Sequence, residues 1–194
     1  MQSLHSALQR ISLWLAWLAG AIIIFGCAIP ICLDVASRAI TGSTLVESFE
    51  VSGYALAACI GLGMGYTVTT KANIRVDILT AKLPQPLRRT VDLIASVSLA
   101  VTALALAYFT FDVLSDSWKL NARSESTLQV PLVIPQSIWW MGLVWFATVA
   151  VLTPLYAVVR IWAGDAPAFD AALSNASLTD ELEQIGMPTP GDPP

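Results

Sequence analysis

The sequence predicts an all-α integral membrane protein with four long transmembrane helices. Hydrophobic residues make up 56% of the 194 residues and charged residues only 12%, too little polar surface to cover a soluble core. Four long segments lack Asp, Glu, Lys and Arg altogether: 11–33, 51–70, 93–111 and 126–159. Each has room for the roughly 20 apolar residues that a membrane-spanning helix needs.

The first span is expected at about residues 11–38. Its uncharged run covers 23 residues, longer than the roughly 7–15 of a cleaved signal peptide. Ile24 to Cys27 loosely matches a lipoprotein cleavage box, but the apolar run continues to Leu33, so a membrane helix is favoured over lipidation. Asp34 and Arg38 extend this helix, and their acid-first i, i+4 spacing predicts an ion pair.

The second span, at about 48–70, carries small residues at every fourth position. These residues are Gly53, Ala57, Gly61 and Gly65. Small residues on one helix face let another helix backbone approach closely, which is how membrane helices associate. The pattern predicts a helix contact or a subunit interface, and it does not say whether the partner helix is internal or belongs to another protein.

The third and fourth spans are expected at about 88–116 and 134–160. A basic connection from Lys71 to Arg89 precedes the third span and holds five of the ten basic residues. At 3.6 residues per turn its apolar residues fall on two sides. A short interfacial helix and a solvated basic loop fit this pattern equally well, and in either case its basic side chains suit contacts with anionic lipid headgroups.

Both termini are predicted to be cytoplasmic, because basic loops are retained on that side of the membrane. With the N-terminus inside, the inner flanks hold Arg10, Lys71, Arg75, Lys82, Arg88, Arg89 and Arg160, and the outer flanks hold Arg38, Lys119 and Arg123. The tryptophans agree, since most of the seven lie near the expected span ends, where indole rings are favoured.

Residues 1–162 are therefore expected to form a four-helix membrane domain, and residues 163–194 a cytoplasmic tail. The tail has no Lys or Arg, holds six of the fourteen acidic residues, and ends in a Pro-containing segment. This composition predicts an acidic, flexible segment.

Residues that could support catalysis are scarce. The single histidine, His5, precedes the first span, so a bis-histidine haem or a Ser/His hydrolase cannot be built within the membrane. The cysteines Cys27, Cys32 and Cys59 form no CxxC pair. The sequence contains no phosphate-binding glycine loop, acidic metal cluster or nucleic-acid motif, so neither a catalytic residue nor a metal or cofactor is predicted.

Charged residues gather instead at the expected outer ends of the spans. They are Asp34, Arg38, Glu47, Glu50, Asp116 and Lys119. A carboxylate deep in a membrane can mark an ion pathway. These groups lie near the interface, where hydration or pairing is available, so structural roles or contacts with a partner protein are favoured.

The order of these features resembles the small membrane subunit of tripartite ATP-independent periplasmic (TRAP) transporters, from about Arg10 to Arg160. The matching features are Arg38, Glu50, the segment Ile74-Arg75-Val76-Asp77 after the second span, and Leu132-Val133-Ile134-Pro135 at the start of the fourth. The cytoplasmic signature comprises Lys71, Asn73, Arg75, Asp77, Lys82, Arg88 and Arg89. The family usually has His where this chain has Asn73, and Asn cannot titrate near neutral pH.

The resemblance implies a non-catalytic subunit of a bacterial inner-membrane importer driven by an ion gradient, with sodium as the expected ion. Its partners would be a large many-helix subunit, a periplasmic substrate-binding protein and membrane phospholipids, and its cargo an organic acid or related solute. The small subunit would scaffold the large elevator subunit and help form the docking surface. Two alternatives remain: a quinone-binding membrane anchor of a respiratory complex, and an autonomous carrier with Glu50 in the transport path.

Overall fold

The computed structural model describes residues 2–43, 47–71, 84–126 and 128–173, and most of them are helical. The elements are α1 (Gln2–Ile23), a π-helical turn η1 (Ile24–Ala28), α2 (Ile29–Thr41), α3 (Ser48–Thr69), α5 (Gln85–Lys119), α6 (Val133–Trp162) and α7 (Ala166–Leu173). In these described ranges the one isolated β-bridge joins Arg123 and Pro131. The predicted all-α class is confirmed.

Four helical segments are long and apolar enough to cross a membrane. They are Ser6–Thr41, Ser48–Thr69, Gln85–Lys119 and Val133–Trp162, each within a few residues of the expected span. At 1.5 Å per residue the first segment is about 54 Å long, well beyond the roughly 30 Å hydrocarbon core of a bilayer. The helix is therefore tilted, or its ends extend beyond the hydrocarbon core. The charged residues of this segment lie near its two ends.

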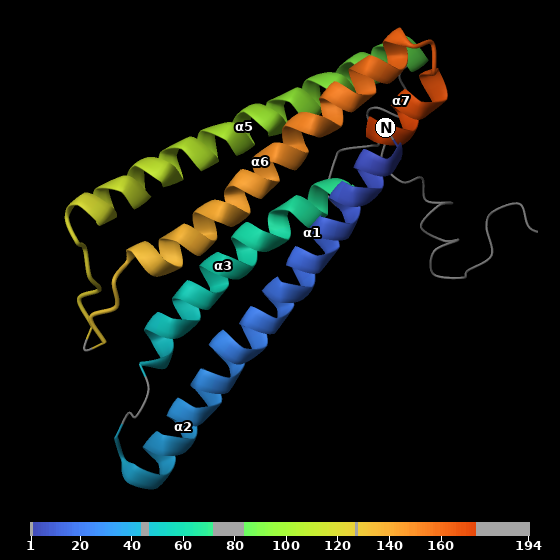
Figure 1. Ribbon diagram of the computed structural model, residues 1–194. Helices are drawn as coiled ribbons and strands as arrows, with labels where there is room; N and C mark the ends of the chain where they lie inside the picture. Colours follow the sequence, from blue (N-terminus) through green and yellow to red (C-terminus); the bar gives the residue numbers. More distant parts are fainter. Residues whose placement is uncertain (1, 44–46, 72–83, 127, 174–194) are drawn as a thin grey trace, which may run out of the picture.

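The four spans lie side by side in the order α1, α3, α6, α5, as Figure 1 shows. The most extensive contacts join α3 with α6, α1 with α3, and α5 with α6. The largest buried cluster lies between α3, α5 and α6 and includes Ala103, Phe146 and Val149, with Leu8 of α1 packed against it. The two central helices, α3 and α6, thus connect the outer pair.

The first span changes its helical geometry in the middle. Pro30 has no backbone N–H, and its ring would clash with the carbonyl four residues earlier in a regular α-helix. The preceding turn is widened, so that the Ile29 N–H bonds to the Ile24 carbonyl, five residues back. Gly26 of this turn faces α3, where an added Cβ would lie 2.8 Å from the Ala55 Cβ. The wide turn and the close helix approach therefore coincide.

Both described ends of the chain lie at the same end of the molecule, as an even number of spans requires (Figure 1). Helix α5 of the third span begins at Gln85, three residues before the expected start of the span: Pro84 is extended, with φ −60° and ψ 147°, and Pro86 falls in the first turn of α5. The interfacial helix considered for the basic connection falls in residues 72–83, outside the described residues.

Helix α7 corrects part of the tail prediction. Residues 163–194 were expected to be a flexible tail, yet Ala166–Leu173 forms a helix that packs against α6 and α5. Phe169 and Leu173, one turn apart, are buried against Ala157 of α6, with Leu93 of α5 beside them. Burial of this apolar i, i+4 pair stabilises a helix here, although the acidic composition of the segment predicted flexibility. Residues 174–194 lie outside the described residues.

Candidate functional site

A close contact between α3 and α6 joins two glycines. A Cβ on Gly142 of α6 would lie 2.4 Å from the backbone carbon of Gly61 in α3, and a Cβ on Gly61 would lie 2.9 Å from the backbone oxygen of Trp139. Two helix backbones can approach this closely only where side chains are absent. Sequence reasoning found Gly61 through its spacing but missed Gly142, whose role depends on the register between the two helices.

Gly65 allows a side chain of α6 to cross α3. A Cβ at this position would lie 2.5 Å from Cδ1 of Trp145. The Trp145 indole Nε1 passes this glycine and donates a 3.0 Å hydrogen bond to Oγ of Ser12 on α1. Ser12 is fully buried, so this bond ties three helices together inside the bundle.

Gly53, the first residue of the small-residue pattern, faces away from the other helices of the chain. A Cβ on Gly53 would meet nothing within 4 Å, and Gly53 shares an exposed face of α3 with Phe49, Leu56 and Ile60. We call these four residues the α3 outer stripe. Ala57 lies beside it and is half-buried. The pattern seen in the sequence therefore divides into an internal contact at Gly61 and Gly65 and an open face at Gly53.

A second run of small residues, which sequence reasoning missed, lines the α5–α6 contact. The spacing between its members alternates between four and three residues. The members are Ser96, Ala100, Ala103, Ala107 and Thr110. Trp140 of α6 donates from Nε1 to the Ala107 backbone carbonyl at 3.1 Å. The four–three spacing is the signal that could have identified this helix face.

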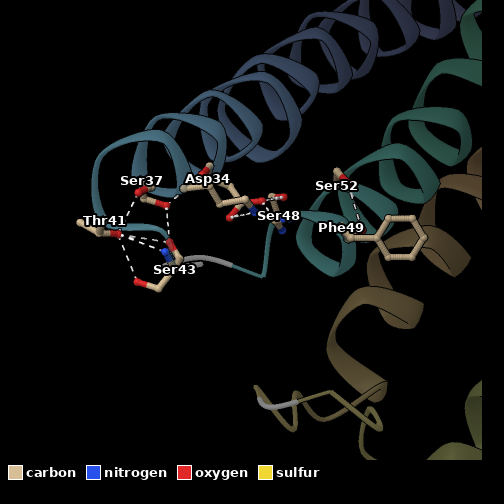
Figure 2. A network of polar contacts seen from close by, with 8 residues as sticks. Asp34, Ser37, Thr41, Ser43, Ser48, Phe49 and Ser52 are labelled. Carbon is tan, nitrogen blue, oxygen red and sulfur yellow. Dashed lines mark hydrogen bonds and ion pairs between the residues drawn. The ribbon is translucent and has the colours of Figure 1, made fainter.

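Asp34 joins the end of the first span to the start of the second, as Figure 2 shows. Arg38 Nη2 lies 2.9 Å from Asp34 Oδ2 and Nε lies 3.2 Å from Oδ1, so the predicted ion pair is confirmed. Ser48 of α3 donates to Oδ2 at 2.8 Å. The Asp34 carboxylate is buried and Arg38 is mostly exposed, so the pair presents a positive group to the outside.

The turn after Asp34 is closed by short polar contacts. Gly42, with φ +72°, ends α2 in the left-handed conformation and donates its N–H to the Arg38 carbonyl at 3.0 Å. Figure 2 shows Ser37 and Thr41 directed toward Ser43, with Ser37 Oγ also bonded to the Asp34 carbonyl at 2.9 Å. These bonds fix the direction in which the chain leaves the first span.

Glu50 joins α3 to the loop between α5 and α6. Its carboxylate accepts hydrogen bonds from the hydroxyls of Tyr54, at 2.5 Å, and Ser126. Ser124 Oγ lies 2.9 Å from Ser126 Oγ, and the Ser124 N–H bonds to the Val130 carbonyl. Sequence reasoning identified Glu50 and missed the serines, which lie 74 and 76 residues later in the chain.

The other predicted outer charges are Asp116, Lys119 and Glu47. Asp116 and Lys119 form an exposed pair with 3.4 Å between Oδ1 and Nζ. Glu47 immediately precedes α3. Within the described ranges, no group of three or more His, Cys, Asp or Glu side chains is arranged to hold a metal ion.

Ion pairs also join the elements at the opposite end. Arg89 of α5 binds Asp170 of α7 through two hydrogen bonds, of 2.7 and 2.6 Å. These hydrogen bonds, helped by the charges of Arg89 and Arg88, hold the pKa of Asp170 below its ordinary value. Arg88 lies 4.0 Å from Asp92, and Arg160 lies 3.3 Å from Asp165.

The cytoplasmic signature is only partly within the described residues. Lys71 follows the second span, with φ +56°, and Arg88 and Arg89 lie near the start of the third. Asn73, Arg75, Asp77 and Lys82 lie outside the described residues. Their proposed lipid contacts remain predictions.

Four long apolar spans joined by close helix contacts define the class of this protein: a small multi-pass membrane protein. A comparison with protein families matches residues 27–163 to the tripartite ATP-independent periplasmic transporters, DctQ component, and the chain belongs to that family. It is the small membrane component of a TRAP transporter, located in the inner membrane, whose other parts are a large membrane component and a periplasmic binding component. The resemblance found in the sequence is confirmed. No curated protein and no solved structure matched the chain.

Proposed function

We propose that this chain is the non-catalytic scaffold of a sodium-driven TRAP transporter that imports an organic acid or a related solute. The periplasmic binding component delivers the solute, and the large component carries it across the membrane. The small component holds the fixed part of the large one and contributes to the surface on which the binding component docks.

The observation that carries this proposal is the open apolar face of the central helices. The α3 outer stripe is apolar, and Phe49 within it is 92% exposed. Helix α6 keeps a similar exposed face formed by Ile134, Ile138, Met141, Val144 and Leu155. Lipid tails could cover the apolar side chains alone, but Gly53 leaves space on this face for the backbone of a partner helix to approach closely.

The arrangement of the carboxylates supports a non-catalytic role. Asp34 is engaged by Arg38 and Ser48, and Glu50 by Tyr54 and Ser126. Both therefore serve contacts between elements of the chain. We assign the sodium and solute sites to the large component and a structural role to these two side chains.

The outer ends of the spans are the proposed docking surface for the binding component. Exposed charges of both signs, Arg38, Asp116 and Lys119, are available there. Charged groups at a rim steer association and set the register of a complex.

Uptake by proteoliposomes tests the proposal. We expect the small component alone to take up none of a panel of labelled organic acids. Together, the three components should take up at least one of them when a sodium gradient is applied. Glu50→Gln should lower the yield of assembled complex and leave sodium-dependent uptake per complex unchanged. Sodium-driven uptake by the small component alone would contradict the scaffold role.

A further inference from the structure

A groove between the start of α1 and the end of α3 has the features of a lipid-binding site. It has a volume of about 310 Å³ and is lined by Ser6, Gln9, Arg10, Leu13, Tyr66, Thr69 and Thr70. That volume is at the lower end of the roughly 300–1,000 Å³ of small-molecule sites. We propose that this groove binds a phospholipid headgroup that carries both a phosphate and a hydrogen-bond donor.

The charge of the groove selects an anionic group. Arg10 is the one charged residue among its lining residues. The other arginines described at this end, Arg88, Arg89 and Arg160, each face an aspartate of the chain, whereas Arg10 has no ion pair within the described residues. A guanidinium presents its N–H donors in a planar fork that matches two oxygens of a phosphate.

The threonines of the groove select a donor beside that phosphate. The hydroxyls of Thr69 and Thr70 both donate to the Tyr66 backbone carbonyl at 2.9 Å. With their single hydrogens used, these oxygens are left as acceptors. The glycerol hydroxyls of phosphatidylglycerol and the ammonium of phosphatidylethanolamine can donate to them, and the choline group of phosphatidylcholine cannot.

The remaining features separate a membrane lipid from a free phosphate ion. Leu13 adds an apolar side chain to the groove lining. Trp14 and Trp17, 65% and 75% exposed, lie one and two turns along the same side of α1 from Arg10. Exposed tryptophans at a span end mark the headgroup level of a bilayer. An acyl chain can therefore follow α1 while the headgroup occupies the groove.

The test is native mass spectrometry of the full chain in a non-ionic detergent, titrated with phosphatidylglycerol, phosphatidylethanolamine or phosphatidylcholine. We expect the first two lipids to be retained at about fivefold higher occupancy than the third. Arg10→Gln should lower that occupancy about fivefold, in line with one basic residue at a headgroup. Arg123→Gln, which changes an exposed arginine at the other end, should leave it unchanged.

Three results would overturn the proposal. They are equal retention of phosphatidylcholine by the unmodified chain, unchanged occupancy in Arg10→Gln, and displacement of the lipid by millimolar inorganic phosphate. The double variant Thr69→Val and Thr70→Val provides a second test, because it should abolish the preference over phosphatidylcholine while keeping Arg10. Circular dichroism and elution as a single species check that each variant is folded.

Discussion

At the scale of single residues, the bundle depends on positions without side chains. Gly65 lets Trp145 cross α3 and bond to Ser12, and Gly61 lets α3 meet Gly142 of α6. Within a membrane the hydrophobic effect does not drive helices together, so close packing and buried hydrogen bonds must do so. These glycines are thus contacts of the chain with itself and would be poor positions for probing a partner subunit.

Substitution of Gly65 should destabilise the bundle. In Gly65→Ala the new Cβ would lie 2.5 Å from Trp145 Cδ1, so the indole must move and lose its bond to Ser12. We expect a loss of about 1–3 kcal/mol, typical of overpacking, measured as the free energy of unfolding in mixed micelles. Gly63→Ala is the matched control, because a Cβ there meets nothing within 4 Å. Equal stability of the two variants would show that the Trp145 crossing is unimportant.

At the scale of elements, α7 is a cap held to the spans by one apolar pair and one ion pair. Phe169 and Leu173 are buried at its inner face, while Asp170 binds Arg89. A helix of eight residues is too short to be stable alone in water. Its order therefore depends on these contacts with α5 and α6.

The Asp170–Arg89 contact makes the docking of α7 depend on pH. The folded pKa of Asp170 lies below the ordinary 3.8, because Arg89 donates hydrogen bonds to the charged carboxylate. The stabilisation is therefore complete at pH values well above 3.8 and is lost as the pH falls below it and through the folded pKa.

A nitroxide on Ala168→Cys, with the native cysteines replaced by alanine, should report this loss. We expect its mobility to rise as the pH is lowered from about 4 to about 2, below the ordinary pKa of 3.8. Asp170→Asn should give a mobile label throughout that range, and the control Asp116→Asn should keep the original profile. A profile unaffected by Asp170→Asn would mean that the ion pair does not hold α7.

Local sequence features were enough to predict elements and contacts that form within one segment. The four spans follow from length and hydropathy, and the Asp34–Arg38 pair follows from helical spacing. The partners of Gly61, Trp145 and Glu50 could not be predicted, because they depend on the register between helices, which is set by packing of the whole bundle. Helix α7 was missed because the acidic composition obscured one buried apolar pair.

At the scale of the whole molecule, the spans form a row with polar contacts at both ends and apolar faces between them. The hydrogen bonds of Asp34 and Glu50 lie at one end of the row, and the Arg89–Asp170 pair and the proposed lipid groove lie at the other. The distribution of basic residues predicts that the end with the Arg89–Asp170 pair faces the cytoplasm.

Cysteine labelling tests this orientation. In a cysteine-free background, Ser43→Cys and Ala163→Cys place single exposed thiols at opposite ends. An impermeant maleimide should label Ser43→Cys in spheroplasts, and Ala163→Cys only after permeabilisation. The reverse pattern would show that the termini face the periplasm.

The central claim, that the chain is a scaffold for a large subunit, is tested most directly by mild-detergent purification from native membranes with mass spectrometry of the retained proteins. Gly53→Leu and Gly20→Leu are a matched pair, because a Cβ at either glycine meets nothing within 4 Å, but only Gly53 lies in the α3 outer stripe. The unmodified chain and Gly20→Leu should retain a large many-helix partner, and Gly53→Leu should lose it about tenfold, equivalent to about 1.4 kcal/mol. Equal retention by both variants would contradict the proposed α3 contact, and an unmodified chain without a large partner would contradict the scaffold role itself.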